Sequence, residues 1–308
     1  MHKRVLALAL VLALMLCGCA AAPAGPEEDC IAATTYPVWQ FTCAVTEGTP
    51  LTVERVISEP VSCVHDYTLS VDQMKILSRS RAVVTSGLGL EDFLLDVLPE
   101  DGCIDASEGI EALESDGHAH DEYDHDEHDH DAHDHDAHGH DHGEYDPHIW
   151  LDPSRAAQMI QNIARGLSAL YPQYADIFAE NAESCTARLN KLRLDGEALL
   201  RDLSCRELVT FHDGFSYFAE AFGLHIAAAM EVEAGSEPSA KELESIVRLL
   251  REENIPAVFS ETSGSDATAR IVAGETGAGV YALDLGMGER DYFSAMEHNL
   301  NTIREALK

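Results

Sequence analysis

The amino-acid sequence predicts an α/β protein with two lobes of parallel βα units, which a long helical spine joins. Three observations support this prediction. Short apolar runs alternate with amphipathic segments over residues 30–170, and the same alternation returns over residues 205–308. Between them, residues 171–204 carry apolar side chains at helical spacing. Strands separated by helices pair in parallel through right-handed crossovers, and a chain of 308 residues is long enough for two cores.

Local signals place the strands and helices of the N-terminal lobe. Pro37 suits the first turn of a helix, and Ser70 with Gln73 forms a capping box. Asp152 is a good N-cap residue and precedes Pro153, which suits the first position of a helix. The expected strands are 31–36, 51–57, 82–85 and 103–106, and the expected helices begin at Pro37 and Ser70 and cover 90–98 and 153–170.

The spine and the C-terminal lobe are predicted in the same way. The spine begins near Pro172 and continues to about Leu203. Ser239 and Glu242 form a second capping box. The expected strands are 208–211, 226–230, 257–260 and 280–283, and the expected helices are 214–222, 239–250, 267–276 and 291–308.

The N-terminus predicts export and a membrane anchor. A short basic stretch precedes an apolar run over residues 5–16, which is too short to span a bilayer and is typical of a secretory signal. The run ends in Leu16-Cys17-Gly18-Cys19, which resembles a bacterial lipobox. We therefore expect residues 1–19 to be a lipoprotein signal peptide, Cys19 to be lipidated and residues 20–29 to be a tether. The protein would then be extracytoplasmic, at the cell surface or in a periplasm. The alternative is an ordinary signal peptide cleaved near the alanine-rich stretch.

Charge and cysteine content limit the classes of function. A formal net charge of −35 with only 20 Lys and Arg argues against a nucleic-acid partner. An acidic balance suits cations, although it also serves solubility. Apart from the lipobox there are six cysteines, and none forms the C-x-x-C pair typical of a thiolate zinc site. The sequence does not choose among the disulfide pairings open to Cys30, Cys43, Cys63, Cys103, Cys185 and Cys205.

Residues 117–143 form a low-complexity tract in which histidines alternate with Asp, Glu, Ala and Gly. The tract has no Lys or Arg and almost no apolar residue, so we expect a disordered loop. Imidazole binds zinc readily, and neighbouring carboxylates attract the cation, so several weak metal sites are expected. The alternative is a solvated acidic linker. The ten histidines are His118, His120, His125, His128, His130, His133, His135, His138, His140 and His142.

Three further histidines occupy positions where ligands gather in α/β proteins. His65 follows the second predicted strand, His148 precedes the helix that starts at Pro153, and His212 follows the strand 208–211. Asp284 directly follows the strand 280–283. Because ligands bind beyond the carboxyl ends of parallel strands, we expect these side chains to face a metal site in the cleft between the lobes.

Residues 31–308 resemble the substrate-binding proteins of bacterial ABC importers for zinc and manganese, the cluster A-I metal-binding family. The resemblance depends most on the segment from Asp146 to Pro153, which is similar to the family signature D-P-H-x-W-L-D-P. The acidic histidine-rich insert is similar to that of the zinc-uptake branch. Further matches are Thr35-Tyr36-Pro37, the segment Gly87 to Glu91, the segment Phe211 to Phe218, Glu237-Pro238-Ser239 and Leu283-Asp284.

The resemblance implies that His65, His148 and His212 are metal ligands and that Asp284 supplies a carboxylate. Two departures leave the fourth ligand open. The sequence lacks the Pro or Glu that relatives place directly before the first ligand, and it shortens the turn after the carboxylate. The fourth ligand is therefore Asp284, a water molecule or Glu261 at a neighbouring strand end.

The ligand set and the resemblance together predict the cargo. Three imidazoles and one oxygen donor suit tetrahedral Zn²⁺, whereas Mn²⁺ prefers oxygen ligands. We expect a monomeric protein, not an enzyme, that delivers Zn²⁺ to an ABC permease and its ATPase. The alternatives are a surface zinc buffer or adhesin without an importer, and a zinc hydrolase. The hydrolase has little support, because the sequence has no H-E-x-x-H motif.

Overall fold

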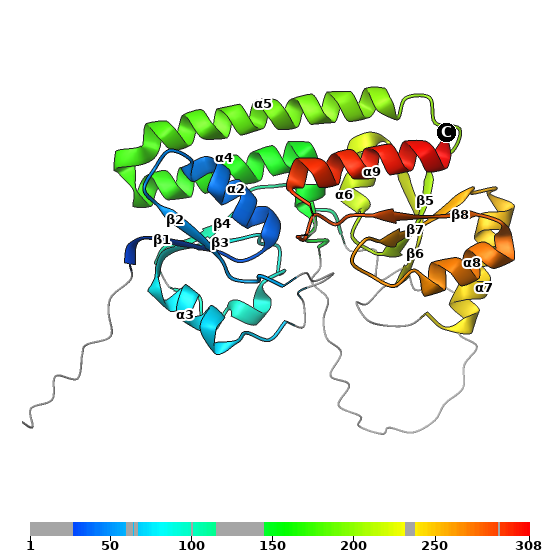
Figure 1. The fold of residues 1–308 in the computed structure, drawn as a ribbon, viewed down its shortest axis with the longest axis horizontal. Coiled ribbons are helices and arrows are strands. Elements are labelled where there is room, and N and C mark those ends of the chain that lie inside the picture. Colours follow the sequence, from blue (N-terminus) through cyan, green and yellow to red (C-terminus); the bar gives the residue numbers. More distant parts are fainter. Residues whose placement is uncertain are drawn as a thin grey trace, which may run out of the picture.

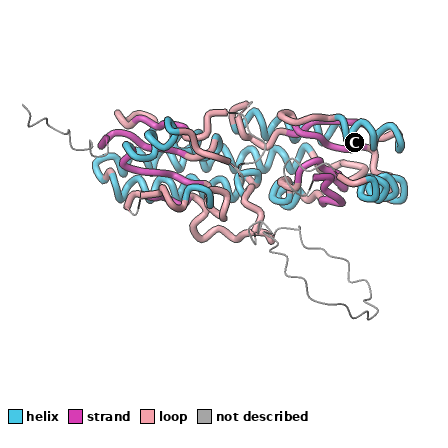
Figure 2. The backbone as a smooth tube through the Cα atoms, turned by 90° about the horizontal axis from the view of Figure 1, so that it is seen from below, coloured by secondary structure: helices cyan, strands magenta, loops and turns pink. Residues whose placement is uncertain are grey.

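The chain forms two parallel sheets of four strands each, and helices pack against both. The computed structural model describes residues 27–59, 64, 67–99, 101–114, 145–231, 238–288 and 290–308. The strand orders are β2-β1-β3-β4 and β6-β5-β7-β8, with every pairing parallel. The sheets lie toward opposite ends of the long axis (Figures 1 and 2). The predicted two-lobe α/β fold is confirmed.

The N-terminal sheet and its helices follow the sequence prediction with two exceptions. The strand expected over residues 31–36 spans Glu27–Ala33 instead, and Tyr36 is already the first residue of the following helix. The Ser70 hydroxyl caps α3, and Gln73 closes the capping box, as expected. The helix expected over 90–98 is wrong, because only a 3₁₀ turn forms there. Glu91 instead turns inward and accepts hydrogen bonds from Ser86 N at 2.7 Å and Gly87 N at 3.0 Å. The elements are β1 (Glu27–Ala33), α2 (Tyr36–Thr46), β2 (Thr52–Arg55), α3 (Val71–Arg79), β3 (Ser80–Thr85), η1 (Asp92–Leu94) and β4 (Cys103–Asp105).

The helical spine spans both lobes. A short turn, η3 (Ile149–Leu151), leads into α4 (Pro153–Leu170), and Asp152 Oδ1 accepts from Ser154 N at 2.6 Å to cap it. After the turn η4 (Pro172–Tyr174), α5 (Ala175–Leu199) continues as a helix of 25 residues. This helix contacts α2 and α4 at one end and α6 and α9 at the other (Figure 1).

The C-terminal lobe repeats the βα alternation. Ser239 and Glu242 form the expected capping box at the start of α7. Asp291 caps the last helix by accepting from Ser294 N at 3.2 Å. The elements are β5 (Glu207–His212), α6 (Ser216–Phe222), β6 (His225–Glu231), α7 (Ala240–Glu252), β7 (Ala257–Glu261), α8 (Ala267–Thr276), β8 (Gly279–Leu283) and α9 (Tyr292–Leu307).

The largest hydrophobic core runs across both lobes. Its members include Ile31 of the first sheet, Phe178 of α5 and Ile303 of α9, all fully buried. Trp150 lies between the lobes and is also fully buried, and its Nε1 donates to Leu285 O at 2.8 Å. Burial of this continuous apolar surface favours one arrangement of the lobes.

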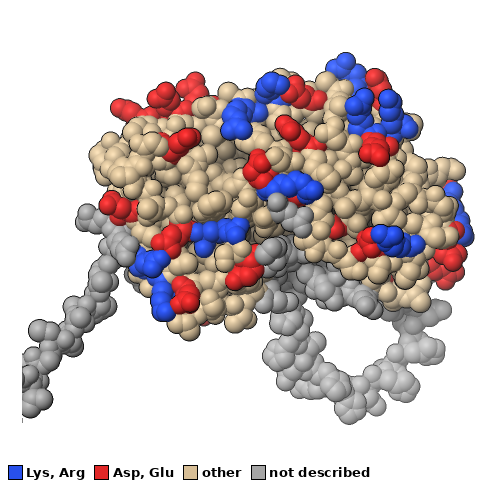
Figure 3. All heavy atoms as spheres, viewed as in Figure 1, with Lys and Arg blue, Asp and Glu red and all other residues tan. Residues whose placement is uncertain are grey.

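The outer surface of the lobes carries both signs of charge. Figure 3 shows basic and acidic side chains side by side over much of one face. On α5, Lys191 pairs with Asp195 and Arg193 with Glu197, at helical i, i+4 spacing. No described helix has the length and apolar character needed to cross a membrane.

Candidate metal centre

His148 lies in the segment between the lobes, directly before η3, and Asp146 holds it in two ways. The Oδ1 atom of Asp146 accepts a hydrogen bond from His148 N at 2.9 Å and lies 2.7 Å from His148 Nδ1. Both residues are buried, with 3% of His148 and 5% of Asp146 exposed. The imidazole is therefore fixed within the protein rather than displayed on its surface.

The contact with Asp146 determines which ring nitrogen of His148 a metal meets. A carboxylate only accepts hydrogen bonds, so Nδ1 donates and the lone pair of Nε2 is left for a metal ion. The other carboxylate oxygen, Asp146 Oδ2, is buried and makes no hydrogen bond within the described part of the chain. Asp146 opens the segment that resembles the family signature, but it was not among the predicted site residues. Its Asp-x-His spacing was the available signal.

His212 is the last residue of β5, at the carboxyl end of the second sheet. Its ring centroid is 5.3 Å from that of His148, and the ring planes are inclined at 84°. A Cβ atom on Gly214 would lie 2.8 Å from Cδ2 of His212 and 3.2 Å from Cε1 of His148, so the backbone there packs against both rings. The fold thus brings two of the three predicted histidine ligands together.

The third predicted histidine ligand, the histidine tract and the predicted lipidation site are not among the described residues. His65 lies outside them, as do Cys19 and the ten histidines of residues 117–143. In the described ranges, no three His, Cys, Asp or Glu side chains lie close enough to hold a metal ion. The roles assigned to these residues stay predictions.

Asp284 directly follows β8, and protein groups contact both of its carboxylate oxygens. Oδ1 accepts from Gly286 N at 2.8 Å, and Oδ2 pairs with Arg290 Nη1 at 2.8 Å. The Asn299 side chain bonds the Asp284 backbone N and O, each at 2.8 Å. A metal at Asp284 would have to share the carboxylate with Arg290. Glu261, the other candidate, ends β7 and is also buried.

Two α/β lobes on a long helix, with two buried imidazoles where the lobes meet and a carboxylate that orients one of them, are typical of a metal-binding solute receptor. The model of the ZnuA family, described as zinc-uptake complex component A periplasmic, matches residues 31–306, and the chain belongs to this family. The resemblance inferred from the sequence is confirmed. The family consists of solute-binding proteins for zinc uptake rather than enzymes.

Individual relatives agree with this assignment. A putative metal-binding protein of Treponema pallidum is 31% identical over 79% of this chain and 76% of its own length. The zinc-binding lipoprotein AdcA of Streptococcus pneumoniae is 29% identical over 99% of this chain, which spans only 61% of AdcA. A crystal structure of ZnuA is 29% identical, with a TM-score of 0.74 over 92% of this chain and all of that one. The structure of a ZnuA deletion mutant with zinc bound is 27% identical, with a TM-score of 0.73 over 92% of this chain and 99% of that one.

Proposed function

We propose that this chain captures Zn²⁺ outside the cytoplasm and delivers it, as cargo, to an ABC permease driven by its ATPase. The observation that carries the proposal is the buried pair of His148 and His212, with rings 5.3 Å apart and His148 oriented by Asp146. Imidazole nitrogens are preferred ligands of zinc, and a carboxylate behind the ring raises their basicity. Zinc is named in the family description, and a ZnuA relative has been solved with zinc bound.

The full site in this proposal has four ligands. His65 supplies the third imidazole, and Asp284 supplies the carboxylate, with water or Glu261 as its replacement. The tract over residues 117–143 binds zinc weakly and raises its concentration near the lobes. Cys19 carries the lipid that holds the monomeric protein at a bacterial membrane.

Loss of either central histidine tests the site. We expect His148→Ala and His212→Ala each to weaken the tightest zinc binding by more than about a hundredfold, because each removes one of few direct ligands. Competition against a chromogenic chelator in the purified full chain measures this. His225→Ala is the matched control, since that histidine is 71% exposed and pairs with Glu207 on the surface. Wild-type affinity in both His148→Ala and His212→Ala would reject the site.

Delivery is tested in cells. Under zinc limitation, cells with His148→Ala should accumulate no more zinc than cells that lack the chain. Cells with the wild-type chain but without the permease should show the same low uptake. Equal uptake with and without the permease would instead identify a surface buffer or adhesin.

A further inference from the structure

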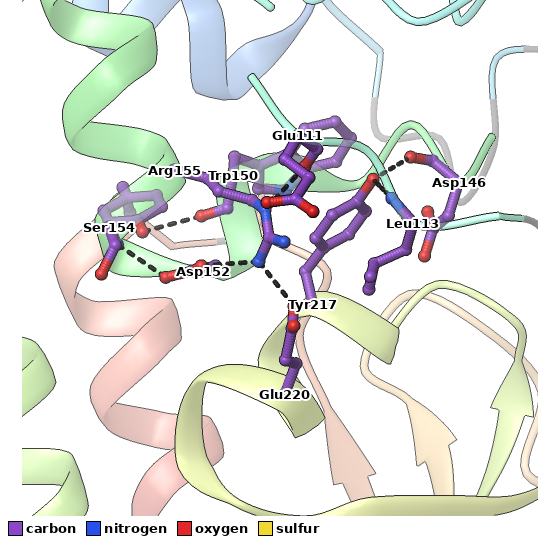
Figure 4. Close-up of polar contacts among 10 residues, drawn as sticks. Glu111, Leu113, Asp146, Trp150, Asp152, Ser154, Arg155, Tyr217 and Glu220 are labelled. Carbon is purple, nitrogen blue, oxygen red and sulfur yellow. Dashed lines mark hydrogen bonds and ion pairs between the residues drawn. The ribbon is translucent and has the colours of Figure 1, made fainter.

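A tyrosine outside the predicted ligand set contacts the backbone beside the metal centre. Tyr217 lies in α6, and its side chain is fully buried. The hydroxyl donates to Asp146 O at 2.7 Å and accepts from Leu113 N at 2.9 Å (Figure 4). Burial raises the pKa of Tyr217 to about 12, so the phenol keeps the proton that it donates.

The two backbone groups that Tyr217 contacts are distant in sequence but adjacent in the fold. Asp146 N donates to Leu113 O at 2.9 Å, and Glu114 forms an antiparallel bridge with Tyr145. These residues flank the histidine-rich tract on its two sides. The Tyr217 hydroxyl therefore adds two hydrogen bonds to the junction where the chain leaves the N-terminal lobe for the tract and returns from it.

Asp146 connects this junction to the metal centre. Its backbone N and O bond to Leu113 and Tyr217, while its carboxylate bonds to both N and Nδ1 of His148. Asp has a short side chain, so it can hold the imidazole in one orientation only if its own backbone is fixed. The hydroxyl of Tyr217 thus acts on the ring of His148 through one intervening residue.

Tyr217 also belongs to the part of the fold that carries the other histidine. Helix α6 begins at Ser216, shortly after His212 at the end of β5. The Tyr217 ring packs under Arg155, whose guanidinium carbon lies 4.8 Å from the ring centroid. Arg155 in turn pairs with Asp152 at 2.8 Å and with Glu220 at 2.7 Å, which ties α4 to α6 (Figure 4).

We propose that Tyr217 is a positioning residue for the metal centre: its hydroxyl, acting through Asp146, holds the His148 ring at a fixed angle to His212. The proposal rests on the proposed function, because it takes His148 as a ligand. Packing alone does not explain why this residue is a tyrosine, since a phenylalanine would fill the same space without the hydroxyl.

The test removes only the hydroxyl. In the full chain, Tyr217→Phe keeps the ring under Arg155 but leaves Asp146 O and Leu113 N without their partner. We expect zinc affinity to fall about tenfold, at the low end of the effect of removing a group behind a metal ligand. One equivalent of Co²⁺ should also give a changed visible absorption spectrum, because the angle between the two imidazoles is no longer fixed.

Two matched variants separate positioning from general loss of stability. Asn162→Ala removes a buried side chain that donates to Ala106 O at 2.8 Å and Glu108 O at 2.9 Å in the N-terminal lobe. Arg155→Met removes the guanidinium above the ring but leaves the hydroxyl. Both should keep the wild-type cobalt spectrum, even where the melting temperature falls.

The outcomes are distinguishable. Wild-type affinity and spectrum in Tyr217→Phe would overturn the proposal, and the proposed function would stand if His148→Ala still lost zinc. The same spectral change in Asn162→Ala or Arg155→Met would also overturn it, because the effect would then not belong to the hydroxyl. Unchanged zinc binding in His148→Ala alone would overturn the proposal, and unchanged binding in both His148→Ala and His212→Ala would overturn the proposed function as well.

Discussion

The carboxylate of Asp284 has two partners within the protein in addition to its proposed metal. The turn after β8 is held by the bond from Gly286 N to Oδ1, and Arg290 pairs with Oδ2 at 2.8 Å. Only 3% of the Asp284 side chain is exposed, against 36% for Arg290. Because buried charges need a partner, the arginine balances this carboxylate in the metal-free protein. Zinc would compete with Arg290 for the same oxygen.

Substitution of Asp284 should therefore affect zinc less than loss of a histidine does. Asp284→Asn keeps an oxygen for Gly286 but loses the charge, and water can replace the carboxylate on zinc. We expect a fall in affinity smaller than that of His148→Ala, measured by calorimetry. Arg290→Met, which leaves the carboxylate to the metal, should bind zinc at least as tightly as wild type. Identical cobalt spectra in wild type, Asp284→Asn and Arg290→Met would show that Asp284 is not a ligand.

For single residues, the sequence predicted which side chains belong to the site better than it predicted the contacts that they make. The positions of His148 and His212 followed from strand ends and a motif, and the structure brings both rings together. The contacts of Tyr217 could not be predicted in the same way. Its hydroxyl joins Asp146 and Leu113, which lie 71 and 104 residues away along the chain, and no local pattern encodes such a pairing.

Helices with local signals were predicted well, because their caps depend on residues three positions apart. The Ser70 and Ser239 capping boxes form as expected. The helix expected over 90–98 failed for a tertiary reason. Glu91 accepts from Thr34 Oγ1 at 2.6 Å across the lobe. Apolar spacing alone does not reveal this constraint.

Replacing glycine by alanine should have opposite effects on the free energy of unfolding in two helices. Gly196 lies in α5 where it crosses the C-terminal lobe, and a Cβ there would collide with Phe222 and lie 3.0 Å from two atoms of Leu300. Gly274 lies in α8 with nothing within 4 Å of such a Cβ. We expect Gly196→Ala to lower the free energy of unfolding by about 1–2 kcal/mol through overpacking. Gly274→Ala should raise it by about 0.5–1 kcal/mol, because alanine favours the helix.

Urea unfolding of the metal-free protein, followed by circular dichroism, measures both variants. Zinc is left out so that a change at the metal centre cannot alter the comparison. A gain in stability for Gly196→Ala equal to that for Gly274→Ala would show that α5 does not pack tightly on the C-terminal lobe.

The molecule as a whole holds its lobes together independently of the histidine tract. The continuous core, the spine α5 and the bond from Tyr292 OH to Trp150 O at 2.8 Å all connect described residues outside 117–143. Asp146, His148 and His212 also lie outside the tract. The tight site and the tract are therefore expected to be separable.

Deletion of residues 117–143 tests this separation. The cut is geometrically mild, because Glu114 and Tyr145 already pair across a β-bridge and Ser115, Asp116 and Glu144 would remain to join them. We expect one tight zinc site to persist in equilibrium dialysis, while the weaker additional binding disappears with ten of the sixteen histidines.

The formal charge of the removed segment is negative, so the capture of zinc from dilute solution should slow and become less sensitive to salt. Growth under zinc limitation should suffer less than with His148→Ala, since the tract supplies local concentration rather than the transported ion's final ligands. Loss of the tight site along with the tract would show that the zinc centre lies in the tract, and that the buried histidines do not form it.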